Sequence, residues 1–208
     1  MLRFEILCCT HSAFEFIIDL AEMSMLEEFK GDCKSLSSLQ IFRKYILNGE
    51  CYLLTKTLHF QIREDICEHF SVEFNDVIMV GSGKLGFSLK PGKRFAEFSD
   101  DSDIDIAIVS SRLFERVWEE AYLYKKSAAD WPNCSSFFRY LSEGWIRPDK
   151  LPSSNYFKFS KQWWDFFNDL TKTEKYGPFK IRAGLYHSHF FLKEYQIICI
   201  EQCMQEIS

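Results

Sequence analysis

Two short segments decide the fold: VIMVGSGK at residues 77–84, and SDIDIAIV at residues 102–109. Each is an apolar run rich in β-branched residues, which is typical of a buried strand. The first run ends at Gly81-Ser82, where small residues favour a sharp turn. In the second, aspartates alternate with isoleucines, so the side chains of Asp103 and Asp105 should leave the same face. The sequence therefore predicts strands at about 76–80 and 103–109, each with polar groups at one end.

The two aspartates predict a cation site. Side chains two residues apart on a strand are separated by roughly 6–7 Å. Carboxylates at that distance repel each other and raise each other's pKa unless a cation lies between them. Hard oxygen ligands that leave room for water suit Mg²⁺ bound together with substrate phosphates. A solvated acidic strand face is the alternative, although aspartate is disfavoured in strands and Asp100 and Asp101 add further negative charge nearby.

The turn after the first strand predicts a phosphate site. Backbone N–H groups at Gly81 and Ser82, together with the serine hydroxyl, can hold a phosphate oxygen. Lys84 follows in the same turn and could neutralise phosphate charge, and Ser102 could hydrogen-bond the same phosphates or cap the strand entry. The alternatives are an ordinary turn and an ordinary surface lysine. An ATP-binding P-loop is excluded, because its spacing requires glycine at position 78 and serine or threonine at position 85.

The two segments together resemble the nucleotidyltransferase superfamily of DNA polymerase beta, at residues 80–88 and 102–109. The resemblance implies a small mixed sheet flanked by N- and C-terminal helices. In that family the Gly-Ser turn binds the triphosphate of an NTP, two aspartates hold Mg²⁺, and a hydroxyl attacks the α-phosphate with loss of pyrophosphate. Carried over, Gly81 and Ser82 would bind phosphate. Asp103 and Asp105 would be the catalytic residues that hold Mg²⁺ (or Mn²⁺).

Two departures from the family pattern are visible. The loop between Ser82 and Ser102 is longer than in compact members, and it carries basic residues that could reach the nucleotide or the acceptor, namely Lys90, Lys93 and Arg94. Active members usually carry a third carboxylate on a later strand. The candidate strand here, residues 179–185, offers Lys180 and Arg182 but no acid. A complete two-metal site is therefore not predicted.

The remaining chain is mostly helical in pattern, so the expected fold class is α/β of the α+β kind. We expect a single domain over 1–208, with a helical part at 1–72, the strands and loop of the site at 73–110, and a mostly helical part at 111–208. Ser160 is a plausible N-cap for an expected helix at 161–171. Expected helices, from apolar periodicity and stop signals, are 11–29 (ending at Gly31-Asp32), 36–47, 50–70, 113–124, 134–143, 161–171 and a last one from about 187.

Composition narrows the possible partners. The chain has 208 residues and a net charge of −5, and proteins that grip long nucleic acids usually carry a basic excess, so no bulk DNA binding is expected. Eight cysteines lie within apolar patterns, which favours reduced thiols and a cytoplasmic location. No run is long enough to cross a membrane. A metal site built from His187, His189, Cys199 and Cys203 is a weak alternative.

Three functional hypotheses follow. The first is an enzyme that moves an NMP from an NTP to a hydroxyl of a protein, RNA or small molecule. The second is a catalytically degenerate module that binds a nucleotide or another protein, which the missing third carboxylate motivates. The third concerns biological role: a component of toxin–antitoxin or phage-defence systems, as some small stand-alone members of the family are.

Overall fold

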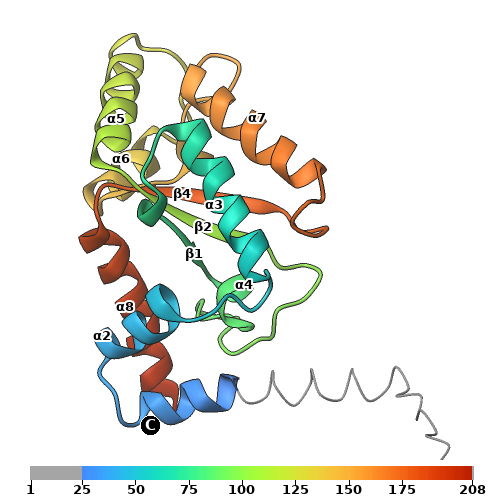
Figure 1. Ribbon diagram of the computed structural model, residues 1–208. Coiled ribbons are helices and arrows are strands. Elements are labelled where there is room, and N and C mark those ends of the chain that lie inside the picture. The colour runs from blue at the N-terminus through green and yellow to red at the C-terminus, as the bar shows by residue number, and fades with distance from the viewer. Residues whose placement is uncertain (1–24, 208) are drawn as a thin grey trace, which may run out of the picture.

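The computed structural model describes residues 25–207. Its centre is a four-stranded mixed sheet in the order β1-β2-β4-β3 (Figure 1). The strands are β1 (Val77–Val80), β2 (Ile104–Val109), β3 (Trp145–Ile146) and β4 (Ile181–Tyr186). β2 pairs with β1 in antiparallel and with β4 in parallel orientation, while β3 runs antiparallel to β4. The mixed sheet with helices before and after it confirms the α+β class.

Helices supply the rest of the structure. Residues 25–33 form a helix that precedes the labelled elements. The others are α2 (Ser38–Ile41), the π-helix η1 (Phe42–Asn48), α3 (Lys56–Phe70), the 3₁₀ turn η2 (Phe74–Asp76), α4 (Ser82–Leu85), α5 (Ser111–Lys126), α6 (Cys134–Ser142), the 3₁₀ turn η3 (Pro148–Lys150), α7 (Lys158–Lys172) and α8 (His189–Ile207). Among residues 25–207, no helix is long and apolar enough to cross a membrane.

One face of the sheet is packed with large apolar side chains. Ile104, Ile106 and Ile108 of β2 point to this face and belong to a core built with α3, α5 and α7, which lie together on one side of the sheet in Figure 1. The core is rich in aromatic rings, and Trp163 and Phe167 are fully buried in it. Burial of this area is the main stabilising term for the fold.

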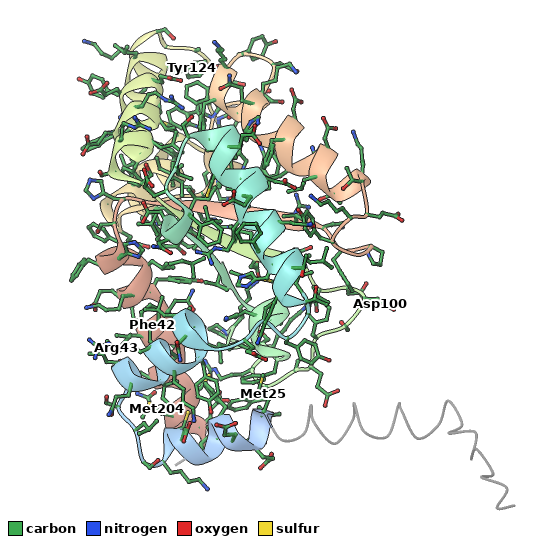
Figure 2. The ribbon with its side chains drawn as sticks, viewed as in Figure 1. Met25, Phe42, Arg43, Asp100, Tyr124 and Met204 are labelled. Atoms are coloured by element: carbon green, nitrogen blue, oxygen red, sulfur yellow. The ribbon has the colours of Figure 1, made fainter. Side chains whose placement is uncertain are left out.

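The opposite face is covered by α8 and the N-terminal helices. Ala107 and Val109 of β2 pack into a second core there, with Leu192 and Ile200 of α8. Figure 2 labels Phe42 of η1 and Met204 of α8, and both lie on this part of the molecule. Strand alternation places Asp105 on the same face as Ala107, but at the start of β2, where the cover of α8 gives way to a cleft.

The expected helix boundaries need two corrections near the N-terminus. The first helix does not stop at Gly31-Asp32 but continues to residue 33, and its expected part at 11–24 lies outside the described residues. The third helix starts at Lys56 rather than near residue 50. The preceding backbone is used elsewhere, since the N–H groups of Tyr52 and Leu53 donate to carbonyl oxygens of α4.

Two further differences concern the second half of the chain. Ser160 is not an N-cap: α7 begins earlier, after Phe157, and the buried Ser160 hydroxyl donates to the carbonyl of Pro152 at 2.7 Å. The strand β3 was not expected. It has only two residues and is defined by its pairing with β4, which periodicity along the sequence does not reveal.

Candidate functional site

The glycine turn and the second aspartate meet in the structure. Val80 lies directly opposite Asp105 in the β1–β2 pair, so the turn that follows Val80 is beside that carboxylate. Gly81 has φ 72° and ψ −163°, a conformation that is essentially restricted to glycine. A Cβ at Gly81 would lie 2.5 Å from Oδ2 of Asp105. The predicted juxtaposition of Gly81 with Asp105 is therefore present, and it depends on the missing side chain.

These groups open onto a cleft of about 650 Å³, a size typical of small-molecule sites. Its walls come from the β1–α4 turn, the loop before β2, the start of β2, the segment around β3, β4 and α8. Its lining includes Ser82, Lys90, Asp105, Trp145, Arg147, Asp149, Arg182 and Tyr186.

Asp105 is strongly influenced by its surroundings. Burial raises the pKa of this carboxyl above its usual range, and the negative charge of Asp103 adds to the rise. Lys90 opposes that shift, because its Nζ lies 3.2 Å from Oδ2. Since the lysine is 61% exposed at its side chain, the pair is weak. Asp105 is thus a carboxylate that a stronger cation would stabilise.

Asp103 lies just before β2 and is partly exposed. Its negative charge contributes to the raised pKa of Asp105. In residues 25–207, no group of three or more His, Cys, Asp or Glu side chains is placed to hold a metal ion. Asp105 lines the cleft and Asp103 lies two residues before it, and their carboxylate oxygens suit Mg²⁺, which takes few protein ligands and completes its shell with water and phosphate.

Three predicted site residues do not line the cleft, namely Asp103, Lys84 and Ser102. Lys84 is only 3% exposed, and its Nζ donates to the carbonyl of Gly49. Burial lowers the pKa of this lysine, whose place is beneath the turn rather than at the phosphate position. The Ser102 hydroxyl accepts a hydrogen bond from the backbone N–H of Ser99 at 3.0 Å, and so closes a turn of the loop.

The basic residues of the long loop separate in the same way. Lys90 lines the cleft. Arg94 instead forms an ion pair with Glu206 of α8 and donates to Gln202 at 3.0 Å. Lys93 is exposed and does not line the cleft. The loop is therefore fastened to α8 by Arg94 and offers one lysine to the cleft.

Most residues on the side of the cleft formed by β3 and β4 were not predicted from the sequence. Arg182 of β4 lies directly opposite Asp105 on the neighbouring strand, and it was noted only because no acid occupies that strand. Trp145 and Arg147 reach the cleft through β3, which was not expected. The indole of Trp145 stacks on Tyr186 with ring centroids 5.6 Å apart. A Cβ at Gly184 would lie 2.6 Å from Nε1 of Trp145, so this glycine makes room for the ring.

Asp149 is the other acid that lines the cleft, and it does not supply a free third carboxylate. Arg147 donates to both of its oxygens at 3.1 Å, and Lys150 contacts it at 3.1 Å. Burial works against the charged form, but these hydrogen bonds hold the pKa of Asp149 below its usual value. The carboxylate of Asp149 is therefore charged, but Arg147 and Lys150 already bind it.

The alternative metal site at the start of α8 is not assembled. The ring of His187 faces Glu115 at 3.3 Å, and the ring of His189 faces Asp76 at 2.9 Å. Burial raises the pKa of Cys199, and that of Cys203 to about 12, so both thiols stay protonated. The six described cysteines are free thiols, as expected, while Cys8 and Cys9 lie outside the described residues.

The cleft thus combines a glycine turn, a buried carboxylate and several cationic and aromatic side chains. Comparison with family models, with curated proteins and with solved structures gave no match for this chain.

Proposed function

We propose that the chain is a Mg²⁺-dependent nucleotidyltransferase that moves an NMP from an NTP to a hydroxyl of a protein, an RNA or a small molecule. The observation that carries this proposal is the contact between the glycine turn and the second aspartate. The carboxylate of Asp105 lies where a side chain at Gly81 would be, at the wall of a cleft large enough for a nucleotide.

Each residue of the site has a distinct task in this proposal. Ser82 lines the cleft, and its hydroxyl hydrogen-bonds a phosphate oxygen of the NTP. Asp103 and Asp105 hold Mg²⁺ (or Mn²⁺), which neutralises charge that develops on the phosphates during transfer. Lys90 pairs with Asp105, and its exposed side chain can turn to a phosphate when the nucleotide enters.

A second candidate function is a nucleotide-binding module without turnover. The observation that favours it is Arg182, which stands opposite Asp105 on β4, where an acid would be needed for a second metal ion. Phosphate binding would then persist while transfer is lost. A role in toxin–antitoxin or phage-defence systems stays a prediction about biology, and growth arrest on expression, relieved by Asp103→Ala, would test it.

Label transfer from an α-³²P NTP tests the first proposal. The four NTPs are supplied in turn with Mg²⁺ or Mn²⁺ and with the protein itself, RNA and small hydroxyl compounds as acceptors. We expect labelled product from the wild type, and its loss in Asp103→Asn and Asp105→Asn. Asp100→Asn is the matched control, because Asp100 is an exposed acid on the nearby loop (Figure 2).

The outcome separates the two candidates. Retained transfer in Asp105→Asn would contradict the assignment of the site. Nucleotide binding with no labelled product from any acceptor would favour the module without turnover.

A further inference from the structure

Among the basic residues that line the cleft, Arg182 is the one on a strand of the central sheet. In the parallel β2–β4 pair it lies opposite Asp105. Partners in register lie on the same face of a sheet, so both side chains leave the face that carries the cleft, and both line it. The positive charge of Arg182 also acts to lower the pKa of Asp105.

Unlike Lys90 and Arg147, the Arg182 guanidinium forms no ion pair with a described carboxylate, although Asp105 lies opposite it in the sheet. Lys90 is paired with Asp105, and Arg147 is paired with Asp149. Within residues 25–207, Arg182 makes no hydrogen bond or ion pair, and its one recorded contact is with the ring of Trp164, at 5.7 Å. A partly buried charge without a partner is costly. A ligand anion in the cleft would remove that cost.

The cleft carries more positive than negative charge. Three cations line it, on three separate segments: Lys90 on the loop before β2, Arg147 after β3 and Arg182 on β4. Two carboxylates line it, Asp105 and Asp149, and each is already paired. A lining of this kind suits a ligand with several negative charges, and the planar fork of arginine suits phosphate oxygens in particular.

We propose that Arg182, assisted by Lys90 and Arg147, binds the phosphate chain of the nucleotide as a fixed cation. This inference rests on the proposed function, since it assumes that a nucleotide occupies the cleft. Its consequence is specific. Phosphate binding persists when divalent cations are removed.

Calorimetry on the full chain tests this proposal with two probes, ATP and inorganic tripolyphosphate, each in EDTA and in Mg²⁺. We expect both probes to bind the wild type in EDTA. Arg182→Gln should weaken that binding about ten- to hundredfold, because it removes charge-assisted hydrogen bonds. Arg182→Lys should recover part of it, since the charge returns without the fork.

Arg112→Gln is the matched control. Arg112 is an exposed arginine that donates to the carbonyl of Ser71 at 2.8 Å, outside the cleft. Its replacement should leave the affinity for both probes unchanged. Urea midpoints verify that each variant is folded, and Lys90→Gln, at an exposed position, gives a second measurement if Arg182→Gln is unstable.

The results distinguish failure of this inference from failure of the proposed function. Binding of ATP only in Mg²⁺, with unchanged affinity in Arg182→Gln, would overturn the role of Arg182 and leave the aspartate site standing. No binding of either probe in either condition would overturn both. Binding in EDTA that depends on Arg182 supports the inference, whether or not transfer is observed.

Discussion

The two faces of the sheet use the same strand differently. On the face toward α3, α5 and α7, β2 contributes Ile104, Ile106 and Ile108, all of which are buried in an aromatic core. On the face toward α8, the same strand contributes Val109, Ala107 and finally Asp105. The first face is apolar along the whole strand. The second is apolar at one end and open to the cleft at the other.

This difference shows how the fold positions a charged group. The isoleucines fix β2 against a rigid core, and alternation along the strand then places the carboxylate of Asp105 beside Gly81. Functional side chains on regular elements backed by packed cores are held more precisely than those on loops. We therefore expect changes to the apolar face to act on stability, and changes to the cleft face to act on ligand binding.

The largest effect should come from Trp163→Ala on the apolar face. Trp163 is 1% exposed and packs against Phe70, Phe159 and Phe167. Deleting its indole leaves a cavity and should lower the free energy of unfolding by about 3–5 kcal/mol. Trp118→Ala on α5 is the control, because Trp118 is 45% exposed and should cost no more than about 0.5 kcal/mol. Urea unfolding measures both, and equal losses would contradict this division of the core.

Gly81→Ala, on the cleft face, should give the second-largest loss of stability. The alanine must adopt a backbone conformation that only glycine normally takes, and its methyl group must displace the carboxylate of Asp105. Together these should lower the free energy of unfolding by about 1–3 kcal/mol. Nucleotide binding should be lost along with stability. Gly92→Ala is matched, because Gly92 also has a positive φ, of 79°, but has no atom within 4 Å of its Cβ position.

Gly92→Ala should therefore lose only about 1 kcal/mol, as expected for an unfavourable backbone angle, and keep its affinity for ATP. The measurements are urea unfolding and calorimetry. If Gly81→Ala binds ATP as well as Gly92→Ala does, the contact between the glycine turn and Asp105 is not part of a nucleotide site.

Gly184→Ala changes the side of the cleft formed by β3 and β4, and it should lower the free energy of unfolding less than Gly81→Ala does. Its φ is not in the left-handed region, so only the 2.6 Å contact with Nε1 of Trp145 must be relieved. We expect a loss of about 1 kcal/mol and a change in tryptophan fluorescence as the ring shifts. Gly31→Ala is the control: its Cβ position is open and it lies within a helix, so the change should stabilise by up to about 1 kcal/mol.

The local parts of this architecture could be predicted from the sequence. The alternating pattern of residues 103–109 and the Gly81-Ser82 turn each depend on neighbours along the chain, and β1, β2 and the glycine turn lie where they were expected. The contact of Asp105 with the turn was also predicted. It follows once the two strands pair, because both polar groups lie at the same edge of the sheet.

The parts that could not be predicted depend on long-range pairing. Arg182 becomes a cleft residue only because β4 pairs with β2 in this register, and Trp145 only because two residues pair with β4. The position of Lys84 could not be read from its turn either. It is determined by the carbonyl of Gly49, which comes from a different segment of the chain.

The smallest effect concerns pH and belongs to α3, on the apolar face. Burial lowers the pKa of His59 to about 4, and the positive charges of Lys84 and Arg63 contribute. Between about pH 6.5 and pH 4 the unfolded chain binds a proton at His59 that the folded chain does not, so stability falls as the pH falls through this window. The loss should be under about 1 kcal/mol from pH 7 to pH 5, since His59 is partly exposed.

His59→Gln should remove this contribution. Urea unfolding of the wild type and of the variant at pH 7 and pH 5 gives the difference, and NMR titration of the imidazole gives the pKa directly. Acidification should then destabilise the variant less than the wild type, while ATP affinity at pH 7 stays the same in both. An equal response to acid in the two proteins would mean that the folded protein does not keep His59 of α3 neutral. Water would then reach this part of the apolar face.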